Sequence, residues 1–370
     1  MPFLFQKLLV YKHYLKQNIK GFIAYYNYKN KQKALNIHNK AIFINIKDNP
    51  YHRYFYTFLK FFQIEGFDIY LPKNYILISK IHNDQYASYI LKDELVNFIK
   101  LKTIKKFPKM ILIDEKSLSH DYFHYLLSKT KTKESYYVPI SQHPLQYYKK
   151  LWDTPLNPLY KRKNSILIFG NFDKQQYNVI KVEGIFNVLS RIDIVEFIKE
   201  QPYSLEIKSK EAFNSFLNGE NDKKVVSIES INFRIPMEEL RIIINKFNFF
   251  FAIPGVVMPF SHNIIEAMST GTIPFIQKSY AELFTPPLEH QVNAIIFSDS
   301  ADLNTEIYKT LSLEETEIKK LRENVGRYYN TYLTPKAVVN TIVTNNFKKI
   351  YLQAEHNSLE LIKDKNPIKS

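Results

Sequence analysis

Along the first 155 residues, apolar positions follow two patterns, short continuous runs and helical spacing. Short apolar runs typical of strands occur at residues 41–46, 67–71, 75–79, 110–114 and 136–140. Stretches with helical spacing lie between them, at residues 54–63, 86–100 and 122–127. Strands that alternate with helices need crossover connections, which favour a mostly parallel sheet. Residues 1–155 therefore predict an N-terminal Rossmann-like α/β domain.

The same alternation resumes after a break at residues 150–164, which combine two prolines, turn formers and a charge run without apolar periodicity. Strands are predicted at residues 165–169, 225–228, 249–253 and 294–297, and another restarts after Gly271. Helices are predicted at residues 179–189, 237–247, 263–268, 301–311, 313–332 and, after Pro335, at about 337–353. Residues 164–335 therefore predict a second Rossmann-like domain, followed by a last helix and polar tail at 336–370.

Composition agrees with two domains. The chain has 370 residues, of which 45% are hydrophobic and 15% aromatic, which is enough for two cores. The absence of cysteine excludes disulfides and thiolate metal sites. No run approaches the roughly 20 apolar residues of a membrane span, and the N-terminus lacks the apolar core of a signal peptide. We expect a soluble or peripheral cytoplasmic protein.

The net charge of +15 is concentrated at the N-terminus, where residues 1–40 hold eight lysines and no acid. At helical spacing one apolar stripe forms, with three lysines beside it; the stripe is Leu4, Leu8, Tyr11, Leu15, Ile19 and Phe22, and the lysines are Lys12, Lys16 and Lys20. Such a helix suits an anionic membrane surface, here the inner face of the cell membrane. The alternative is a plain helix packed on the N-terminal domain, because 44 of the 51 basic residues are lysine and the bias is general.

Residues 254–276 carry the strongest functional signal. An apolar run meets a Pro-Gly break at Gly255, a short helical segment carries the single acid Glu266, and Gly271 precedes the next apolar run. In an open parallel sheet, ligands bind where strands end and helices begin, because helix amides favour phosphate and carboxylates accept from ribose. The segment therefore predicts half of a nucleotide site. The alternative is a solvated acid on a short helix.

The run Asn263-Ile-Ile-Glu266-Ala-Met268-Ser-Thr-Gly271-Thr-Ile-Pro274 resembles the signature of the C-terminal domain in GT-B-fold glycosyltransferases, including the exostosin-like and group 1-like members. The resemblance implies two Rossmann-like doubly wound domains facing across a cleft, with the last helix crossing back to the first. It implies that Glu266 binds the ribose of a nucleotide sugar and that Gly271 lets the helix end close to the next strand. Many retaining members carry a second Glu eight residues earlier, where this chain has Met258, so a retaining outcome does not follow.

Further donor-binding residues are expected in the second domain. Gly170 ends its first predicted strand, which resembles the loop that lies against the donor diphosphate. Arg191 and Lys208 are candidate diphosphate clamps, although a surface salt bridge of Arg191 with Asp193 or Glu196 is an equal alternative. Arg234, between Phe233 and Ile235, lies where related folds contact the base.

The start of the predicted helix at 263–268 adds to the donor site. Ser261 and Asn263 are candidate N-caps, and the helix amides carry partial positive charge. His262 lies in the preceding loop, where it could contact the sugar or a phosphate oxygen.

The acceptor side needs a general base if the reaction inverts. His52 lies in the loop after the first predicted strand, and an imidazole with a near-neutral pKa suits that role. Asp114 and His120, at and just after a later strand end, are rival candidates. For each of the three, the alternative is a structural or solvated side chain.

Together these features predict a glycosyltransferase that moves a sugar from a nucleotide-diphosphate donor to a glycan or lipid-linked acceptor in bacterial surface polysaccharide assembly. No metal or other cofactor is expected, because GT-B enzymes usually rely on helix dipoles and cations. One alternative is a GT-B-fold sugar-nucleotide epimerase, for which the second domain has few acids and histidines. Another is a non-enzymatic basic protein that binds membranes or nucleic acid; against nucleic acid, no aromatic-basic motif is present.

Overall fold

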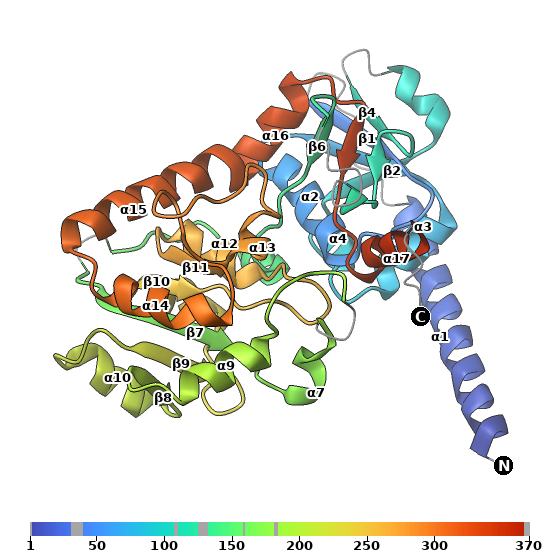
Figure 1. The fold of residues 1–370 in the computed structure, drawn as a ribbon. Helices are drawn as coiled ribbons and strands as arrows, with labels where there is room; N and C mark the ends of the chain where they lie inside the picture. Colours follow the sequence, from blue (N-terminus) through green and yellow to red (C-terminus); the bar gives the residue numbers. More distant parts are fainter. Residues whose placement is uncertain are drawn as a thin grey trace. The chain divides into compact units, whose positions relative to one another are not determined.

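The computed structural model describes residues 2–30, 40–106, 110–124, 132–157, 160–180 and 184–365. The chain forms two compact units (Figure 1). Unit 1 contains Met1–Val138 and Pro335–Ser370, and unit 2 contains Pro139–Thr334. The division falls before the linker predicted at 150–164, which lies inside unit 2. Residues 139–155 were therefore assigned to the wrong domain, because composition marks irregular backbone and not the partner on which it packs.

The main sheet of unit 1 has four parallel strands in the order β3-β2-β1-β4. They are β1 (Ala41–Asn45), β2 (Asp68–Pro72), β3 (Val96–Ile99) and β4 (Ile111–Asp114). Helices α2 (His52–Ile64), α3 (Tyr75–Asn83) and α4 (Tyr89–Lys92) and the 3-10 turn η1 (Leu101–Lys106) connect them. The chain moves from β1 to β2 and β3 on one side and then returns to β4 on the other, so the strand order reverses between β1 and β4.

The C-terminal segment completes unit 1. Helix α16 (Pro335–Thr344) leads into β13 (Lys349–Tyr351), and α17 (His356–Lys365) follows. Strand β13 pairs in parallel with β5 (Leu118–Ser119) on one side and β6 (Ser135–Tyr137) on the other. Tyr351 stacks on Tyr137 with ring centroids 4.7 Å apart. Residues 335–365 are thus part of the first unit's architecture.

Unit 2 is built on six parallel strands in the order β12-β11-β10-β7-β9-β8. The strands are β7 (Lys163–Gly170), β8 (Ser204–Ile207), β9 (Val225–Glu229), β10 (Phe247–Phe251), β11 (Ile273–Gln277) and β12 (Ile295–Phe297). Its helices are α6 (Pro144–Tyr148), α7 (Lys174–Tyr177), α9 (Arg191–Lys199), α10 (Lys210–Asn218), α11 (Met237–Ile244), α12 (His262–Ser269), α13 (Lys278–Ala281), α14 (Ser300–Leu311) and α15 (Glu315–Tyr328), which continues into the π turn η2 (Tyr329–Leu333). The prediction of an α/β chain with two Rossmann-like domains is confirmed. In unit 2 the strand order reverses between β7 and β10.

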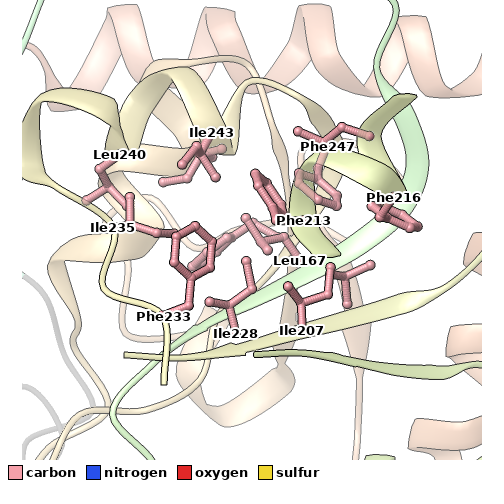
Figure 2. Packing of buried hydrophobic residues seen from close by; sticks show 14 of the residues in the cluster. Leu167, Ile207, Phe213, Phe216, Ile228, Phe233, Ile235, Leu240, Ile243 and Phe247 are labelled. Carbon is pink, nitrogen blue, oxygen red and sulfur yellow. The ribbon is translucent and has the colours of Figure 1, made fainter. Parts of the chain in front are cut away.

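An aromatic core holds one face of the second sheet. Phe213 and Phe216 of α10 stack on Phe247 of β10, and Phe233 and Ile235 of the loop before α11 enter the same cluster (Figure 2). Each buried large side chain contributes roughly 1.5–3 kcal/mol relative to exposure. The cluster therefore fixes α10 and α11 against β7, β9 and β10, which positions the carboxyl ends of those strands.

Four predicted elements are wrong. Residues 75–79 form the start of α3, because Asn74 accepts a hydrogen bond from the Ile76 amide as N-cap and Leu77, Ile78 and Ile81 bury at helical spacing. Residues 86–100 contain α4 and β3, and residues 337–353 contain α16 and β13. Residues 184–189, predicted helical, are irregular. A short apolar run does not distinguish a buried strand from a buried helical turn, so packing decided the case of residues 75–79.

Strand β8 and helices α9 and α10 had no counterpart in the prediction. The helix predicted at residues 122–127 lies partly outside the described residues.

Helix α1 (Pro2–Asn30) packs on α3, but not through the predicted stripe. Leu15, Ile19 and Phe22 are exposed, whereas Gly21 and Ala24 are buried. The side chains of Leu4, Leu8 and Tyr11 lie outside the described residues. Within the described part of the chain, no helix combines the length and apolar character needed to cross a membrane.

Candidate functional site

Unit 1 contains a pocket of about 660 Å³ near the point where its strand order reverses. The loop after β1 supplies Asp48, Asn49 and His52, and the segment after α3 supplies Asp84. His120 follows β5, and Asn357 comes from the C-terminal helix α17. Open α/β sheets bind ligands at such a reversal, outside the carboxyl ends of the strands. The pocket is therefore the candidate ligand site of unit 1.

A histidine and a carboxylate are paired in this pocket. Nδ1 of His52 lies 2.6 Å from Oδ2 of Asp84. The amides of Tyr86 and Ala87 donate to Oδ1 of Asp84 at 2.9 and 2.6 Å, which fixes the carboxylate. Because a carboxylate can only accept, Nδ1 of His52 carries the proton and Nε2 is the basic nitrogen. Nε2 lies 3.4 Å from Nδ2 of Asn357.

The pair changes the acidity of both groups. The hydrogen bond to Asp84 raises the pKa of His52 above its ordinary value, although burial opposes the rise. Burial acts to raise the pKa of Asp84, but the hydrogen bonds from His52 and from the Ala87 and Tyr86 amides leave it below its ordinary value. An ionised Asp84 therefore makes His52 a stronger base than a free imidazole.

His52 also adopts a rare backbone conformation. Its φ is 48°, in the left-handed region that residues other than glycine seldom occupy. Such conformations cost of order 1–3 kcal/mol and concentrate at functional sites. The bond to Asp84 holds the imidazole in one orientation, which is what a positioned base requires.

The two rival acceptor-side candidates have different surroundings. His120 lines the same pocket as His52, and burial lowers its pKa. Asp114 does not line that pocket. Its Oδ1 accepts from the amides of Lys116 and Ser117 and from the Ser117 hydroxyl, so its carboxylate shapes the turn after β4. The structure brings His52 and His120 together and gives Asp114 a structural role.

In unit 2 the strand order reverses between β7 and β10, and Arg191, the first residue of α9, lies at this point. Its Nε and Nη2 donate to the carbonyl oxygen of Pro254 at 3.0 and 2.9 Å, and Nη1 donates to that of Asn171 at 3.0 Å. The guanidinium lies over the Tyr177 ring, 3.8 Å from its centroid. A Cβ at Gly170 would lie 3.1 Å from Nη1 of Arg191, so glycine makes room for the cation. Arg191 thus joins the loops that follow β7 and β10.

This buried cation has no anionic partner among the described residues. Burial lowers the pKa of Arg191 to about 10, which leaves it charged at neutral pH. Asp193 forms a capping box with Ser190, and Glu196 pairs with Lys174. The alternative of a surface salt bridge for Arg191 is therefore wrong. An uncompensated buried charge favours a bound anion at this point of the sheet.

The loop after β10 and the start of α12 lie beside the same reversal. A Cβ at Gly255 would lie 2.7 Å from the Met258 carbonyl oxygen, so this tight loop requires glycine. Ser261 is the N-cap of α12, but its side chain makes no capping bond among the described residues. Asn263 donates to the carbonyl oxygen of Phe169 in β7 at 3.3 Å. The first amides of α12 therefore have no side-chain cap and add positive potential beside β7.

Helix α12 ends as the sequence predicts. Gly271 has φ of 70° and follows the last turn, and its amide donates to the Met268 carbonyl oxygen at 3.0 Å. The left-handed conformation suits glycine and turns the chain directly into β11.

Glu266 is fully buried in unit 2. Its Oε1 accepts from the His143 amide at 3.1 Å, and the side chain of Gln146 lies beside it. Burial raises the pKa of Glu266 to about 7, although the bond from His143, the charge of Arg241 and Gln146 oppose the rise. The carboxylate has no solvent-exposed surface, so its contact with ribose stays a prediction that needs the segment around His143 to move.

His262 belongs to the same buried set. Its Nδ1 lies 2.7 Å from the carbonyl oxygen of Ser141, and its ring meets that of His143 at a centroid distance of 5.4 Å. The predicted contact of His262 with sugar or phosphate is untested.

Two further donor-side candidates, Lys208 and Arg234, have different surroundings from Arg191. Lys208 follows β8, the edge strand two positions from β7 and so about 10 Å away across the sheet, and its Nζ pairs with Glu206 at 3.2 Å. Arg234 is exposed, and its neighbours Phe233 and Ile235 are buried in the core, where they cannot stack on a base. The structure does not bring Lys208 into one cluster with Arg191.

The sequence did not reveal Asp84, Asn357, Tyr177 or the segment at Ser141 and His143. Asp84 follows a helix that was predicted as a strand, so its place beside His52 was hidden. The Asp-Gln-Tyr turn after α3 was the available signal, because aspartates accept from amides two and three residues ahead. Asn357 reaches the pocket across more than 300 residues, and no local pattern encodes that contact.

No protein family and no curated protein matches the sequence. Among solved structures, the chain is similar to a glycosyltransferase from Rickettsia africae, with 12% identity, a TM-score of 0.44, and coverage of 90% of this chain and 100% of that one. It is also similar to HepE from Anabaena in complex with UDP and glucose, with 11% identity, a TM-score of 0.40, and coverage of 83% and 99%. At these identities the likeness concerns the fold.

Proposed function

We propose that the protein is a glycosyltransferase that moves a sugar from a nucleotide-diphosphate donor to a hydroxyl of a glycan or lipid-linked acceptor. The bacterial surface polysaccharide pathway is the proposed setting. Unit 2 would bind the donor and unit 1 the acceptor. The observation that carries the proposal is Arg191, a buried cation at the strand reversal of unit 2 that lacks an anionic partner among the described residues.

The donor half follows from charge. A nucleotide diphosphate leaves with its negative charge on the terminal phosphate, so the reaction needs positive potential that is already in place. Arg191 and the first amides of α12 supply it without a metal ion, and Gly170 and Gly255 permit close approach of the backbone. Glu266 is the proposed ribose contact, on the strength of the sequence resemblance.

The acceptor half follows from His52. Its Nε2 would take the proton of the acceptor hydroxyl as that oxygen bonds to the anomeric carbon and the bond to the diphosphate breaks. Asp84 would stabilise the imidazolium that forms. A base on the acceptor side suits a single displacement, which inverts the anomeric centre.

The donor site is tested by calorimetry with UDP, GDP, CDP and ADP on the wild type and on Arg191→Lys, which keeps the charge but loses the paired hydrogen bonds. We expect one nucleotide to bind and Arg191→Lys to weaken it about tenfold or more.

Arg162→Lys is the matched control. Arg162 is also partly buried and bonds backbone carbonyls, but at Phe247 and Thr270, away from the carboxyl ends of β7 and β10. Equal loss of affinity in both variants would contradict the proposed clamp. No binding of any nucleotide to the wild type would favour a non-enzymatic binding protein.

The base is tested with His52→Asn, because asparagine tolerates the left-handed backbone. We expect kcat to fall by roughly 10²–10⁴-fold with donor affinity unchanged. His120→Asn changes the same side-chain type in the same pocket and should retain most activity. The reverse pattern would make His120 the base.

A further inference from the structure

Helix α1 meets the rest of unit 1 through a narrow, small-residue face. A Cβ at Gly21 would lie 2.0 Å from Oγ of Ser79 in α3, so the two backbones approach closely there. Tyr75 donates to the Asn18 carbonyl oxygen at 3.2 Å, and its ring meets that of Tyr25 at 5.8 Å. These contacts fix which side of α1 faces the protein.

The opposite side carries large apolar side chains with no cover. Five of them are 51–62% exposed: Leu15, Ile19, Phe22, Ile23 and Tyr26. At about 100° per residue they span an arc of roughly 100°, centred about 160–180° from the mean direction of Gly21 and Ala24. We call these five residues the outer face of α1. Because it points away from α3, packing inside unit 1 does not explain it.

Lysines border this face along one edge. Lys12, Lys16 and Lys20 are exposed and recur at one-turn spacing beside it. Residues 1–40 contain no acid that could neutralise them. An apolar strip beside a row of cations matches a surface with an apolar interior and an anionic rim.

We propose that the outer face of α1 docks on an anionic lipid bilayer. The five apolar side chains would enter the boundary between headgroups and acyl chains, and the three lysines would lie among anionic headgroups. Charge selects lipid over a second copy of the chain, because residues 1–40 hold eight lysines and no acid, so the outer face of a second copy offers no negative charge to these lysines. The inference rests on α1 alone and does not depend on glycosyl transfer.

Co-sedimentation of the full chain with vesicles tests the proposal. Vesicles of phosphatidylcholine with 30 mol% phosphatidylglycerol should bind the wild type at least tenfold more strongly than pure phosphatidylcholine, as expected from the Lys contribution. The variant Lys12→Gln/Lys16→Gln/Lys20→Gln should lose about 100-fold in the partition coefficient, because each lysine near such a surface contributes about a fivefold factor.

The double variant Ile19→Glu/Phe22→Glu should lose binding to the anionic vesicles. Ile76→Glu/Ile231→Glu places the same charge on two exposed isoleucines outside α1 and should bind like the wild type. Circular dichroism and urea unfolding show whether each variant is folded.

Equal binding to neutral vesicles, equal loss in the control, or no vesicle binding by the wild type would each overturn the proposal. Sedimentation velocity tests whether a second copy of the chain occupies the outer face instead of lipid. Self-association that Ile19→Glu/Phe22→Glu abolishes, with vesicle binding unchanged, would assign the outer face to a second copy and also overturn it.

Discussion

Replacing Glu266 by glutamine should remove a pH dependence of stability that belongs to this one carboxyl group. The side chain is fully buried, and glutamine keeps its size and an oxygen that can accept from the His143 amide. Gln146 and the charge of Arg241 remain in place. The substitution therefore changes the titration of position 266 and little else.

The magnitude follows from the displacement of the pKa. Burial raises the pKa of Glu266 from 4.5 to about 7 in the folded protein. Between these values the unfolded chain has released the proton and the folded chain retains it, so the free energy of unfolding falls as pH rises from about 4.5 to 7. At about 1.4 kcal/mol per pH unit the loss is about 3 kcal/mol, to within a factor of two. The group is fully buried, so solvent screening does not reduce the figure much.

Urea unfolding of wild type and Glu266→Gln at pH 4.5, 6 and 8 measures the effect. The stability of the variant relative to wild type should increase by about 3 kcal/mol from pH 4.5 to 8, because other titrating groups cancel in the difference. Glu282→Gln, at an exposed glutamate of the same unit, is the control for the change of residue type. A flat difference for Glu266→Gln, or one no larger than that of the control, would refute the reasoning that this carboxyl is held protonated by burial.

Three further predictions concern the pocket of unit 1 and two glycines of unit 2. Asp84→Asn should lower the pKa of His52, so the acid limb of the kcat–pH profile should move to lower pH as the maximal rate falls; an unmoved limb would show that Asp84 does not act on His52. Gly255→Ala should destabilise unit 2 by about 1–3 kcal/mol in urea unfolding, since its Cβ would collide with the Met258 carbonyl oxygen. Gly326→Ala, inside α15 where no atom lies within 4 Å of the new Cβ, should stabilise it by about 0.5–1 kcal/mol. Equal effects of the two alanines would contradict the steric argument.

The sequence by itself determined the class of fold. Apolar runs at β1, β2, β4, β7, β9 and β12 are short, bounded by turn formers and separated by helical spacing, which is enough to require crossovers and parallel sheets. Gly271 could also be read locally, because a glycine after a helix and before an apolar run marks a left-handed C-terminal turn. These features depend on neighbours within a few residues.

The tertiary structure decided what could not be read locally. Residues 75–79 became a helix because of the Asn74 cap and the burial of one face. Arg191 could have been a surface ion pair, and only the meeting of the β7 and β10 loops made it a buried cation.

The surroundings of His52 and of Glu266 both depend on contacts between distant parts of the sequence. His52 pairs with Asp84, which lies 32 residues later in the sequence. Glu266 accepts a hydrogen bond from a segment that lies more than 120 residues earlier in the chain and is buried there. Local spacing specifies which elements form, whereas burial and charge pairing depend on which elements the sheet order places side by side. The arrangement of both sites is therefore set by contacts between segments that lie far apart in the sequence.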